Sequence, residues 1–359
     1  MRRKDAVFVI AEAGVNHCGS VERARAMVKV AADAGADAIK FQLFSADKIV
    51  SRRTQLAAYQ KANAGEFNSQ FEMLRALELS HAAHVELAKL CRKHRIAFMS
   101  TAFDLDNLKF LAGLNVHAIK IASGDLTFAP LLLAAARTGK PVILSTGMSN
   151  LAEIEEALGV LAFGLLKLPR PPSRAAFRSA FRGVAGLRAL QKNVTLLHCV
   201  TEYPAPSADA NLRAMDTLQT RFQLPVGYSD HTLGINIALA SVARGATVLE
   251  KHFTLDRKLP GPDHRASLEP PELASLIAGV RQIEVALGDG KKTPRSSEIK
   301  NISIARRSIV AATTIRAGEN FSQKNLTFKR PAHGQAPIEF WGLLGKPAKR
   351  AFRKDDEVA

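Results

Sequence analysis

The sequence predicts a (β/α)8 barrel, the TIM barrel of the α/β class, followed by a small C-terminal domain. Eight short apolar runs alternate with helical patterns through residues 1–287, and this alternation is typical of a parallel sheet. Polar residues follow each run, at the end of the strand where a TIM barrel places its catalytic groups. An open, doubly wound sheet remains an alternative, because alternation alone does not show that a sheet closes.

The individual elements follow from the local patterns. The predicted strands cover residues 7–11, 38–41, 96–100, 117–123, 141–146, 194–199, 225–229 and 246–253. The clearest helices cover residues 20–34, 81–94, 103–113, 128–138, 151–163 and 235–244. Ser20 should cap the first helix, because a serine hydroxyl accepts hydrogen bonds from the free N–H groups of a first turn. Segment 164–193 is expected to be a surface excursion with one short basic helix.

The composition changes after Leu287. Residues 288–301 are rich in Gly, Pro, Ser and Lys, which is typical of a linker. Residues 302–359 contain short β-like runs between turn sequences, which predicts a compact β-rich domain. A domain of this size buries little surface by itself and is expected to pack against something else.

The chain is strongly basic, with 50 Lys and Arg against 33 Asp and Glu and a net charge of +17. Such a charge allows nucleic acid, an anionic membrane or a phosphorylated substrate as a partner. Aromatic residues make up only 6%, which argues against single-stranded nucleic acid, whose binding needs stacking platforms. No apolar run reaches the roughly 18 residues of a membrane span. Three distant cysteines exclude a disulfide framework and indicate a reducing cytoplasm.

Two histidines are the best candidate metal ligands. His231 and His252 follow the seventh and eighth predicted strands, whose ends would be neighbours in a barrel. Two neutral imidazoles with open positions beside them are typical of a catalytic metal site. Two hydrogen-bonded histidines at a barrel rim are the alternative, and the pair is not unique, since His17 and His198 also follow strands.

Two lysines are expected to point into the barrel, Lys40 from the second strand and Lys120 from the fourth. A buried lysine is costly unless it is paired, so each would hold an anion or form a Schiff base. The alternative is a lysine that only pairs with Glu12 or Glu250. Hydroxyl side chains at other strand ends suit a phosphate, and these are Ser123, Ser145 and Ser229.

Carboxylates complete the set of candidates. Glu12 ends the first strand and could act as a general acid or base. Asp125, Asp230 and Asp263 could bind sugar hydroxyls. The loop 259–270 follows the eighth strand closely and is expected to form a wall of the site.

Taken together, the motifs resemble those of the sialic acid synthases. In chain order they are IAEAGVNH, KFQ, KIASGD, LSTGM, LLHC, YPAP, GYSDHTLGI, EKHFTLD, PGPDH and SLEP. The tail, with AGENFSQKNLTFKRP and LLGK, resembles the antifreeze-like or SAF domain of that family. The resemblance implies a domain-swapped homodimer that condenses phosphoenolpyruvate with N-acetylmannosamine or a related 2-acetamido aldose. The products would be a sialic-acid-type nonulosonic acid and phosphate, and the partners would include neither nucleic acid nor membrane.

The resemblance also implies a role for each matching residue. His231 and His252 would hold a divalent ion, usually Mn²⁺, with Mg²⁺ or Co²⁺ possible. Glu12 would be the catalytic carboxylate, and Arg330 would be inserted into the site of the partner subunit. The implied phosphoenolpyruvate contacts are Lys40, Lys120, Ser123, Ser145 and Ser229. The polar residues implied around the sugar and the metal are Gln42, Thr101, Asp125, Tyr203 and Asp263.

Departures from the family pattern keep alternatives open. The HCVTEYP motif resembles the form found in legionaminic acid synthases, so the alternative sugar is 2,4-diacetamido-2,4,6-trideoxymannose. Cys18 stands where the family commonly has Asn, and Asp125 replaces the usual Glu. Two more distant alternatives are a class I aldolase that forms a Schiff base on Lys40 or Lys120, and a nucleic-acid-binding protein.

Overall fold

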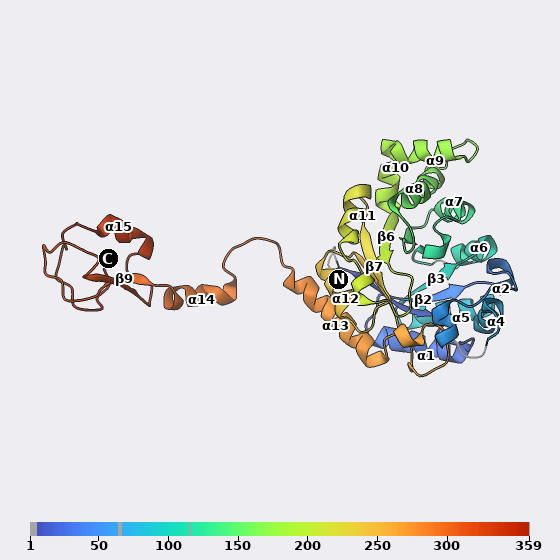
Figure 1. Cartoon of the computed structure of the whole chain (residues 1–359), viewed down its shortest axis with the longest axis horizontal. Helices are drawn as coiled ribbons and strands as arrows, with labels where there is room; N and C mark the ends of the chain where they lie inside the picture. The colour runs from blue at the N-terminus through green and yellow to red at the C-terminus, as the bar shows by residue number, and fades with distance from the viewer. Residues whose placement is uncertain (1–5, 64–66, 115, 359) are drawn as a thin grey trace. The chain divides into compact units, whose positions relative to one another are not determined.

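The computed structural model describes residues 6–63, 67–114 and 116–358. It contains two compact units, Met1–Gly288 and Asp289–Ala359, which Figure 1 draws in blue to orange and in orange to red. Each unit is described by itself. Among the described residues, no helix is long and apolar enough to cross a membrane.

The first unit is a closed parallel barrel. Each strand pairs with the next one along the chain, and β8 pairs with β1. Closure therefore excludes the open sheet. The strands are β1 (Phe8–Gly14), β2 (Ala38–Leu43), β3 (Ala97–Ala102), β4 (Ile119–Ile121), β5 (Val142–Ser145), β6 (Val194–Cys199), β7 (Val226–Asp230) and β8 (Val248–His252).

Helices surround this barrel (Figure 1). The side chain of Ser20 accepts a hydrogen bond from the N–H of Arg23 and caps the first helix, as predicted. The helices of this unit are α1 (Val21–Asp33), α2 (Ala46–Ile49), α3 (Ala58–Asn63), α4 (Gln70–Leu77), α5 (His81–Lys93), α6 (Leu105–Gly113), α7 (Ala129–Arg137), α8 (Leu151–Leu165), α9 (Arg174–Arg182), α10 (Val184–Asn193), α11 (Ala214–Phe222), α12 (Asn236–Ala243) and α13 (Pro270–Ala286). Short 3₁₀ turns are η1 (Ser123–Asp125), η2 (Ser207–Asp209) and η3 (His264–Ala266).

The barrel interior is layered. An apolar layer fills its lower part, formed by Ile10, Ala38, Met99, Ala118, Ile143, Leu197 and Val248. Side chains alternate between the two faces of a strand, so the residue two positions further on faces the same way. These next inward positions carry mostly polar side chains, namely Glu12, Lys40, Thr101, Lys120, Ser145, Cys199 and Glu250. The period of two thus places an apolar layer directly beneath a polar chamber.

The excursion at 164–193 contains two helices, so the prediction of a single short helix was wrong. Gly183 ends α9 and begins α10, and a Cβ on Gly186 would lie 1.8 Å from the carbonyl oxygen of Ala180. This close approach lets the two helices turn sharply. The buried Ala176 and Ala180 form part of the inner face of α9.

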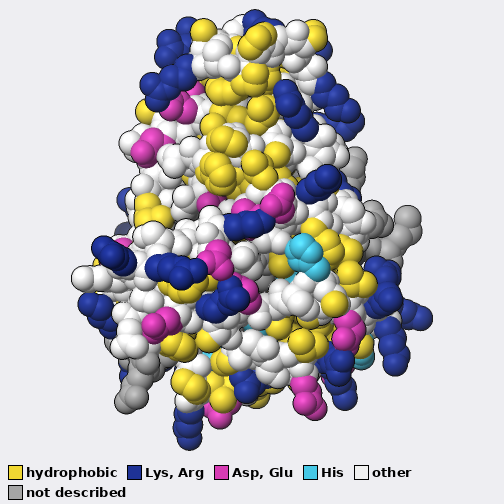
Figure 2. Space-filling view, turned by 90° about the vertical axis from the view of Figure 1, so that its right-hand side faces the viewer, with side chains coloured by type: hydrophobic (Ala, Val, Ile, Leu, Met, Phe, Trp, Pro, Cys, Tyr) yellow, Lys and Arg dark blue, Asp and Glu magenta, His cyan; other side chains and the backbone are white. Residues whose placement is uncertain are grey.

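A groove of about 720 Å³ lies between α7, α8 and α9, with Phe177 and Phe181 among its lining residues. The face of the molecule in Figure 2 carries a strip of hydrophobic side chains flanked by Lys and Arg. The arginines of α9, Arg174, Arg178 and Arg182, are exposed. Much of the basic excess of this segment is therefore solvated surface, as the simplest interpretation of the charge expects.

The second unit has its own small core. It holds α14 (Ser296–Ala305), β9 (Ser308–Ala311), β10 (Leu326–Lys329), the 3₁₀ turn η4 (Pro337–Glu339) and α15 (Phe340–Leu343). Its two strands are antiparallel and have only four residues each. This unit therefore has fewer β residues than predicted. The segment predicted as a linker is helical from Ser296, where the Glu298 carboxylate accepts a 2.9 Å hydrogen bond from the backbone N–H of Arg295 and caps the first turn. The core residues are Ile309, Ala311, Ile315, Phe321, Leu326, Ala348, Phe352 and Val358.

Candidate active site

A cavity of about 200 Å³ lies at the carboxyl ends of the strands. It brings together every site residue predicted within the barrel except Asp125 and Asp230. The predicted residues that line it are Glu12, Lys40, Gln42, Thr101, Lys120, Ser123, Ser145, Tyr203, Ser229, His231, His252 and Asp263. They come from all eight strands or the loops that follow them, so barrel closure gathers them into one chamber.

Four buried ionisable side chains form the floor of this cavity. The Lys40 ammonium lies 2.8 Å from a carboxylate oxygen of Glu12 and 3.5 Å from one of Glu250. The Lys120 ammonium lies 3.7 Å from Glu250. All four are at most 5% exposed. Because unpaired charges in such a place are costly, this mutual pairing explains how the barrel accommodates two lysines.

The protonation states of the two glutamates differ. Burial raises the pKa of Glu12 to about 8, so its carboxyl group carries a proton at neutral pH. Burial also disfavours the charge on Glu250, but Lys120 and Lys40 together lower its pKa to about 2. Burial disfavours the charge on Lys40, but the glutamates outweigh it and raise the pKa of this lysine. A single carboxylate thus faces both lysines, and the floor favours an incoming anion.

Hydroxyl groups extend this positive floor. Lys120 donates a hydrogen bond to the Ser145 hydroxyl at 2.7 Å, and Lys40 donates one to Thr101 at 3.2 Å. The backbone N–H of Gly147 donates to the Ser123 hydroxyl at 3.0 Å. Lysines and hydroxyls that converge on one cavity match the donors that a phosphate group requires.

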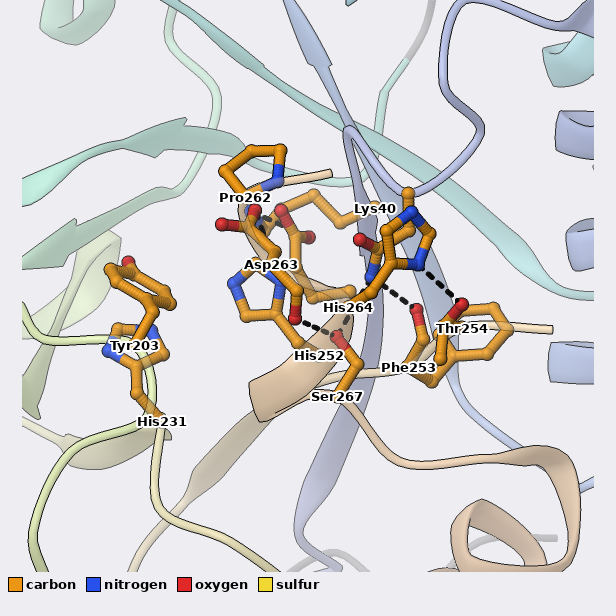
Figure 3. Close-up of polar contacts among 12 residues, drawn as sticks. Lys40, Tyr203, His231, His252, Phe253, Thr254, Pro262, Asp263, His264 and Ser267 are labelled. Carbon is orange, nitrogen blue, oxygen red and sulfur yellow. Dashed lines mark hydrogen bonds and ion pairs between the residues drawn. The ribbon is translucent and has the colours of Figure 1, made fainter. Parts of the chain in front are cut away.

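The two predicted metal ligands lie side by side. Their ring centroids are 5.5 Å apart, and the ring of Tyr203 lies 4.2 Å from that of His231 (Figure 3). Burial lowers the pKa of His231 to about 4 and that of His252 well below its usual value. Both imidazoles are therefore neutral at pH 7, as metal ligation requires.

The hydrogen bonds of these histidines leave lone pairs for a metal. His231 Nδ1 donates to the Val200 carbonyl at 2.5 Å, so its Nε2 carries the lone pair. The nearby Ser229 hydroxyl gives its proton to Glu250 and so does not donate to that nitrogen. His252 Nδ1 has no hydrogen-bond partner among the described residues. The pair fits a divalent ion, although no cluster of three or more His, Cys, Asp or Glu arranged to hold a metal occurs in the described part of the chain.

The loop after β8 forms a wall of the cavity, as predicted, through Pro262 and Asp263. Burial raises the pKa of Asp263 to about 7, and its carboxylate lies 3.7 Å from His252 Nδ1. The Ser267 hydroxyl donates to the Asp263 carbonyl and accepts a hydrogen bond from Asn16. Figure 3 shows the bond between Ser267 and Asp263, and Asn16, which also donates to the Phe253 carbonyl, links the loop to the ends of β1 and β8.

Three predicted residues lie elsewhere. Asp125, in η1, is half-buried and does not line the cavity, and burial raises its pKa to about 6. Asp230 does not face the sugar site, so that prediction was wrong; it forms a 2.7 Å ion pair with Lys251 at 0% exposure. Since Ser229 faces inward, strand alternation turns Asp230 outward. Arg330 is exposed in the second unit, and its role stays a prediction.

Several cavity residues were not predicted. Glu250 was considered only as a partner of a lysine, and Cys199 and Thr201 were passed over although they lie in the HCVTEYP motif. Gln60 reaches the cavity from α3. An apolar wall also lines the cavity and consists of Val15, Met73, Leu74, Leu77 and Phe103. No local sequence signal marks the apolar wall, because most of its side chains come from α4, which is far from any strand end in the sequence.

Comparison with known proteins identifies the family. The sequence matches the NeuB family over residues 27–292 and the SAF domain over residues 306–357. The chain belongs to the NeuB family. This assignment confirms the resemblance to sialic acid synthases, and with it the TIM barrel followed by a SAF domain.

Two relatives of this NeuB chain are N,N'-diacetyllegionaminic acid synthases. The one from Campylobacter jejuni is 47% identical over 98% of each chain. The one from Legionella pneumophila is 43% identical over 94% of this chain and 89% of that protein. A similar solved structure is that of the N-acetylneuraminic acid synthetase from Leptospira borgpetersenii in complex with citrate. Its sequence is 37% identical to this chain, and the two structures have a TM-score of 0.68, covering 83% of this chain and 90% of that chain.

Proposed function

We propose that this enzyme condenses phosphoenolpyruvate with a 2-acetamido aldose of the mannosamine type, and that it depends on a divalent metal. The products are a sialic-acid-type nonulosonic acid and phosphate. The observation that carries the proposal is a single cavity in which a neutral histidine pair lies beside two buried lysines and several hydroxyls. This donor set matches an enol phosphate on one side and a carbonyl on the other.

Phosphoenolpyruvate lies with its phosphate toward the lysines in this proposal. Lys120 and Ser145 are already joined by a hydrogen bond, and Ser123 is held by the N–H of Gly147. These groups are therefore fixed before the substrate arrives. Preorganised donors lose little free energy to reorganisation when negative charge builds up on the leaving phosphate.

His231 and His252 hold the divalent ion, with Mn²⁺ as the first choice and Mg²⁺ or Co²⁺ as alternatives. Such an ion supplies Lewis acidity toward a carbonyl oxygen. Two protein ligands leave the remaining positions to water and substrate, which suits a catalytic site. Tyr203 packs on the His231 ring and restricts its orientation.

Glu12 moves the protons of the reaction. C3 of phosphoenolpyruvate attacks the aldehyde carbon, and the proton held on Glu12 passes to the aldehyde oxygen. Water then adds at C2 and returns a proton to Glu12. The resulting tetrahedral centre carries a hydroxyl and the phosphate on C2. The C2–O bond to the phosphate breaks, the hydroxyl proton leaves with the phosphate, and a ketone forms. A carboxyl group that is protonated at neutral pH fits the acid role.

The sugar that we favour is 2,4-diacetamido-2,4,6-trideoxymannose, which makes the enzyme a legionaminic acid synthase. The apolar wall of Val15, Met73, Leu74, Leu77 and Phe103 supports this choice, because the trideoxy sugar presents a methyl group at C6 and an acetamido group at C4 where N-acetylmannosamine presents hydroxyls. A hydroxyl buried against such a wall without a partner costs about 1–3 kcal/mol. The names of the two relatives agree with the same sugar.

The test is to incubate the enzyme with phosphoenolpyruvate, Mn²⁺ and a panel of mannosamine-type sugars, and to identify the acid by mass. The trideoxy sugar should give the higher kcat/KM. Phosphoenolpyruvate labelled with ¹⁸O at the bridging oxygen should release the label with phosphate. Label retained in the sugar acid would contradict the proposed bond cleavage, and an absence of any nonulosonic acid would contradict the function itself.

The assembly and the compartment are also proposed. We expect a homodimer in which Arg330 of each subunit reaches the partner's site and pairs with a substrate carboxylate. The three cysteines are free thiols, which agrees with a reducing compartment, and we place the enzyme in the cytoplasm.

A further inference from the structure

A thiol and an imidazole meet outside the cavity, at the same end of the barrel. Cys18 lies in the turn after β1, and His264 begins η3 in the loop after β8. The distance from Cys18 Sγ to His264 Nε2 is 3.1 Å. Neither side chain lines the cavity or takes part in the proposed reaction.

The protons of this pair can be assigned from its neighbours. The Thr254 hydroxyl donates to the Asp256 carbonyl at 3.0 Å, so its oxygen accepts a hydrogen bond from His264 Nδ1 at 2.8 Å (Figure 3). With its hydrogen on Nδ1, the imidazole presents a lone pair at Nε2. The carbonyls of Pro260 and Asn16 lie further from the sulfur, at 3.4 and 3.6 Å, so the thiol points its hydrogen at His264.

This arrangement is that of an activated nucleophile, namely a thiol, a base within hydrogen-bond reach, and a third group that orients the base. Cys18 is partly exposed, whereas Cys91 and Cys199 are buried. Burial raises the pKa of Cys18, and the charge of Arg23 opposes this rise. Burial lowers the pKa of His264 to about 4, so the imidazole is neutral at pH 7 and its Nε2 lone pair is available to the thiol hydrogen.

We propose that Cys18 is a modification site at which hydroperoxides oxidise the thiol, with His264 as its base. The sulfur attacks the terminal peroxide oxygen, an S–O bond forms and the O–O bond breaks. Nε2 takes the thiol proton and passes it to the departing oxygen. The products are a sulfenic acid at Cys18 and an alcohol or water, so the sulfur is oxidised and the peroxide is reduced by two electrons. This chemistry does not depend on the proposed function.

Oxidation also has a structural consequence. The thiol of Cys18 contacts both His264 and the Pro260 carbonyl, and these residues flank Asp263 in the wall of the cavity. An added oxygen lengthens the side chain and removes the S–H donor. The loop 260–266 should then open more often, which hydrogen exchange measures directly.

The first test compares alkylation rates in the folded full-length chain. Iodoacetamide followed by mass spectrometry should label Cys18 at least about tenfold faster than Cys91, since exposure and an adjacent base favour reaction. The rate at Cys18 should be nearly flat from pH 6 to 8, because His264 takes the proton. In His264→Gln it should be about a hundredfold lower at pH 6 and should rise about tenfold per pH unit, as free thiolate does, so that it approaches the wild-type rate only near pH 8. His333→Gln, in the second unit, is the matched control and should behave as wild type.

The second test uses hydrogen peroxide with dimedone to trap the sulfenic acid. Adducts should appear at Cys18 first, and hydrogen exchange in the loop 260–266 should rise in the oxidised protein but not in oxidised Cys18→Ser. Labelling of Cys18 no faster than Cys91, a steep pH slope in the wild type, or oxidation at Cys199 in place of Cys18 would each overturn the proposal. The pH slope of the wild type is decisive even if His264→Gln fails to fold.

Discussion

At the scale of single residues, strand alternation decides which polar groups take part in chemistry. Ser229 and Glu250 face the cavity and share a 2.9 Å hydrogen bond. Their chain neighbours, Asp230 and Lys251, face the surrounding helices and form a buried ion pair. Both pairs come from equally polar stretches of sequence, so composition alone does not separate them. The two pairs are separated by their position along the strand, because alternate residues face opposite sides of the sheet.

The histidine pair gives the first prediction. The His231→Ala variant should bind Mn²⁺ at least about tenfold more weakly, because only two side chains would hold the ion. It should also lose nearly all turnover. Calorimetry measures the binding, and a product assay before and after EDTA measures the dependence. His198→Gln is the control, since His198 bonds the Ala210 carbonyl and lies outside the cavity. Full activity of the His231→Ala variant in the presence of chelator would contradict the proposed metal site.

The buried lysines give the second prediction. Lys120→Gln should raise the KM for phosphoenolpyruvate by roughly ten- to a hundredfold, since it removes a charged donor to phosphate. Lys48→Gln, an exposed lysine paired with Asp106, should leave the KM unchanged. Borohydride should trap no adduct on wild-type protein with substrate. A covalent adduct on Lys40 or Lys120 would instead support the Schiff-base aldolase.

At the scale of elements, the packing inside the barrel requires one strand to have no side chain at an inward position. Gly227 is the inward-facing residue of β7 at the level of the apolar layer, where the neighbouring strands β6 and β8 carry Leu197 and Val248. A Cβ added there would lie 2.3 Å from the Val248 carbonyl oxygen and 2.7 Å from Leu197 Cδ2. The interior layer has no room for even a methyl group at this position, which explains why β7 carries a glycine there.

The third prediction tests this packing. Gly227→Ala should lower the free energy of unfolding by about 1–3 kcal/mol or more, the cost of overpacking a core. Gly113→Ala is the control, because a Cβ there meets nothing within 4 Å and alanine stabilises a helical position by up to about 1 kcal/mol. Urea denaturation of the three proteins measures both effects. Equal midpoints for Gly227→Ala and wild type would show that β7 can shift to accept the methyl group.

At the scale of the whole molecule, two units with separate cores are joined through residues 287–295. At about 3.3–3.6 Å per residue, an extended segment of this length spans roughly 30 Å. Arg330 is exposed at the end of β10, where its guanidinium is available to a carboxylate. A connection of this reach is compatible with our proposal that Arg330 acts in the site of the partner subunit.

The fourth prediction concerns the source of that arginine. Arg330→Ala and His231→Ala proteins should each be nearly inactive, and mixing them should restore part of the activity if the arginine acts in the partner's site. Some mixed dimers then hold one site with both groups intact. Recovery of no activity, once tagged subunits are shown to exchange, would place Arg330 in the site of its own chain or outside any site.

The eight alternating strand and helix units, their order and most of the cavity's polar side chains could be predicted from local patterns in the sequence, whereas the closure of the sheet could not. The types of these side chains and their places after strands are local properties that a barrel gathers at one end. Tertiary structure alone decided that Glu250 lies between the two lysines, that Asp230 faces outward and that the apolar residues of α4 wall the cavity. It also decided that Cys18 meets His264, 246 residues away. These facts depend on parity and on long-range packing, because contacts between distant segments leave no pattern in either segment alone.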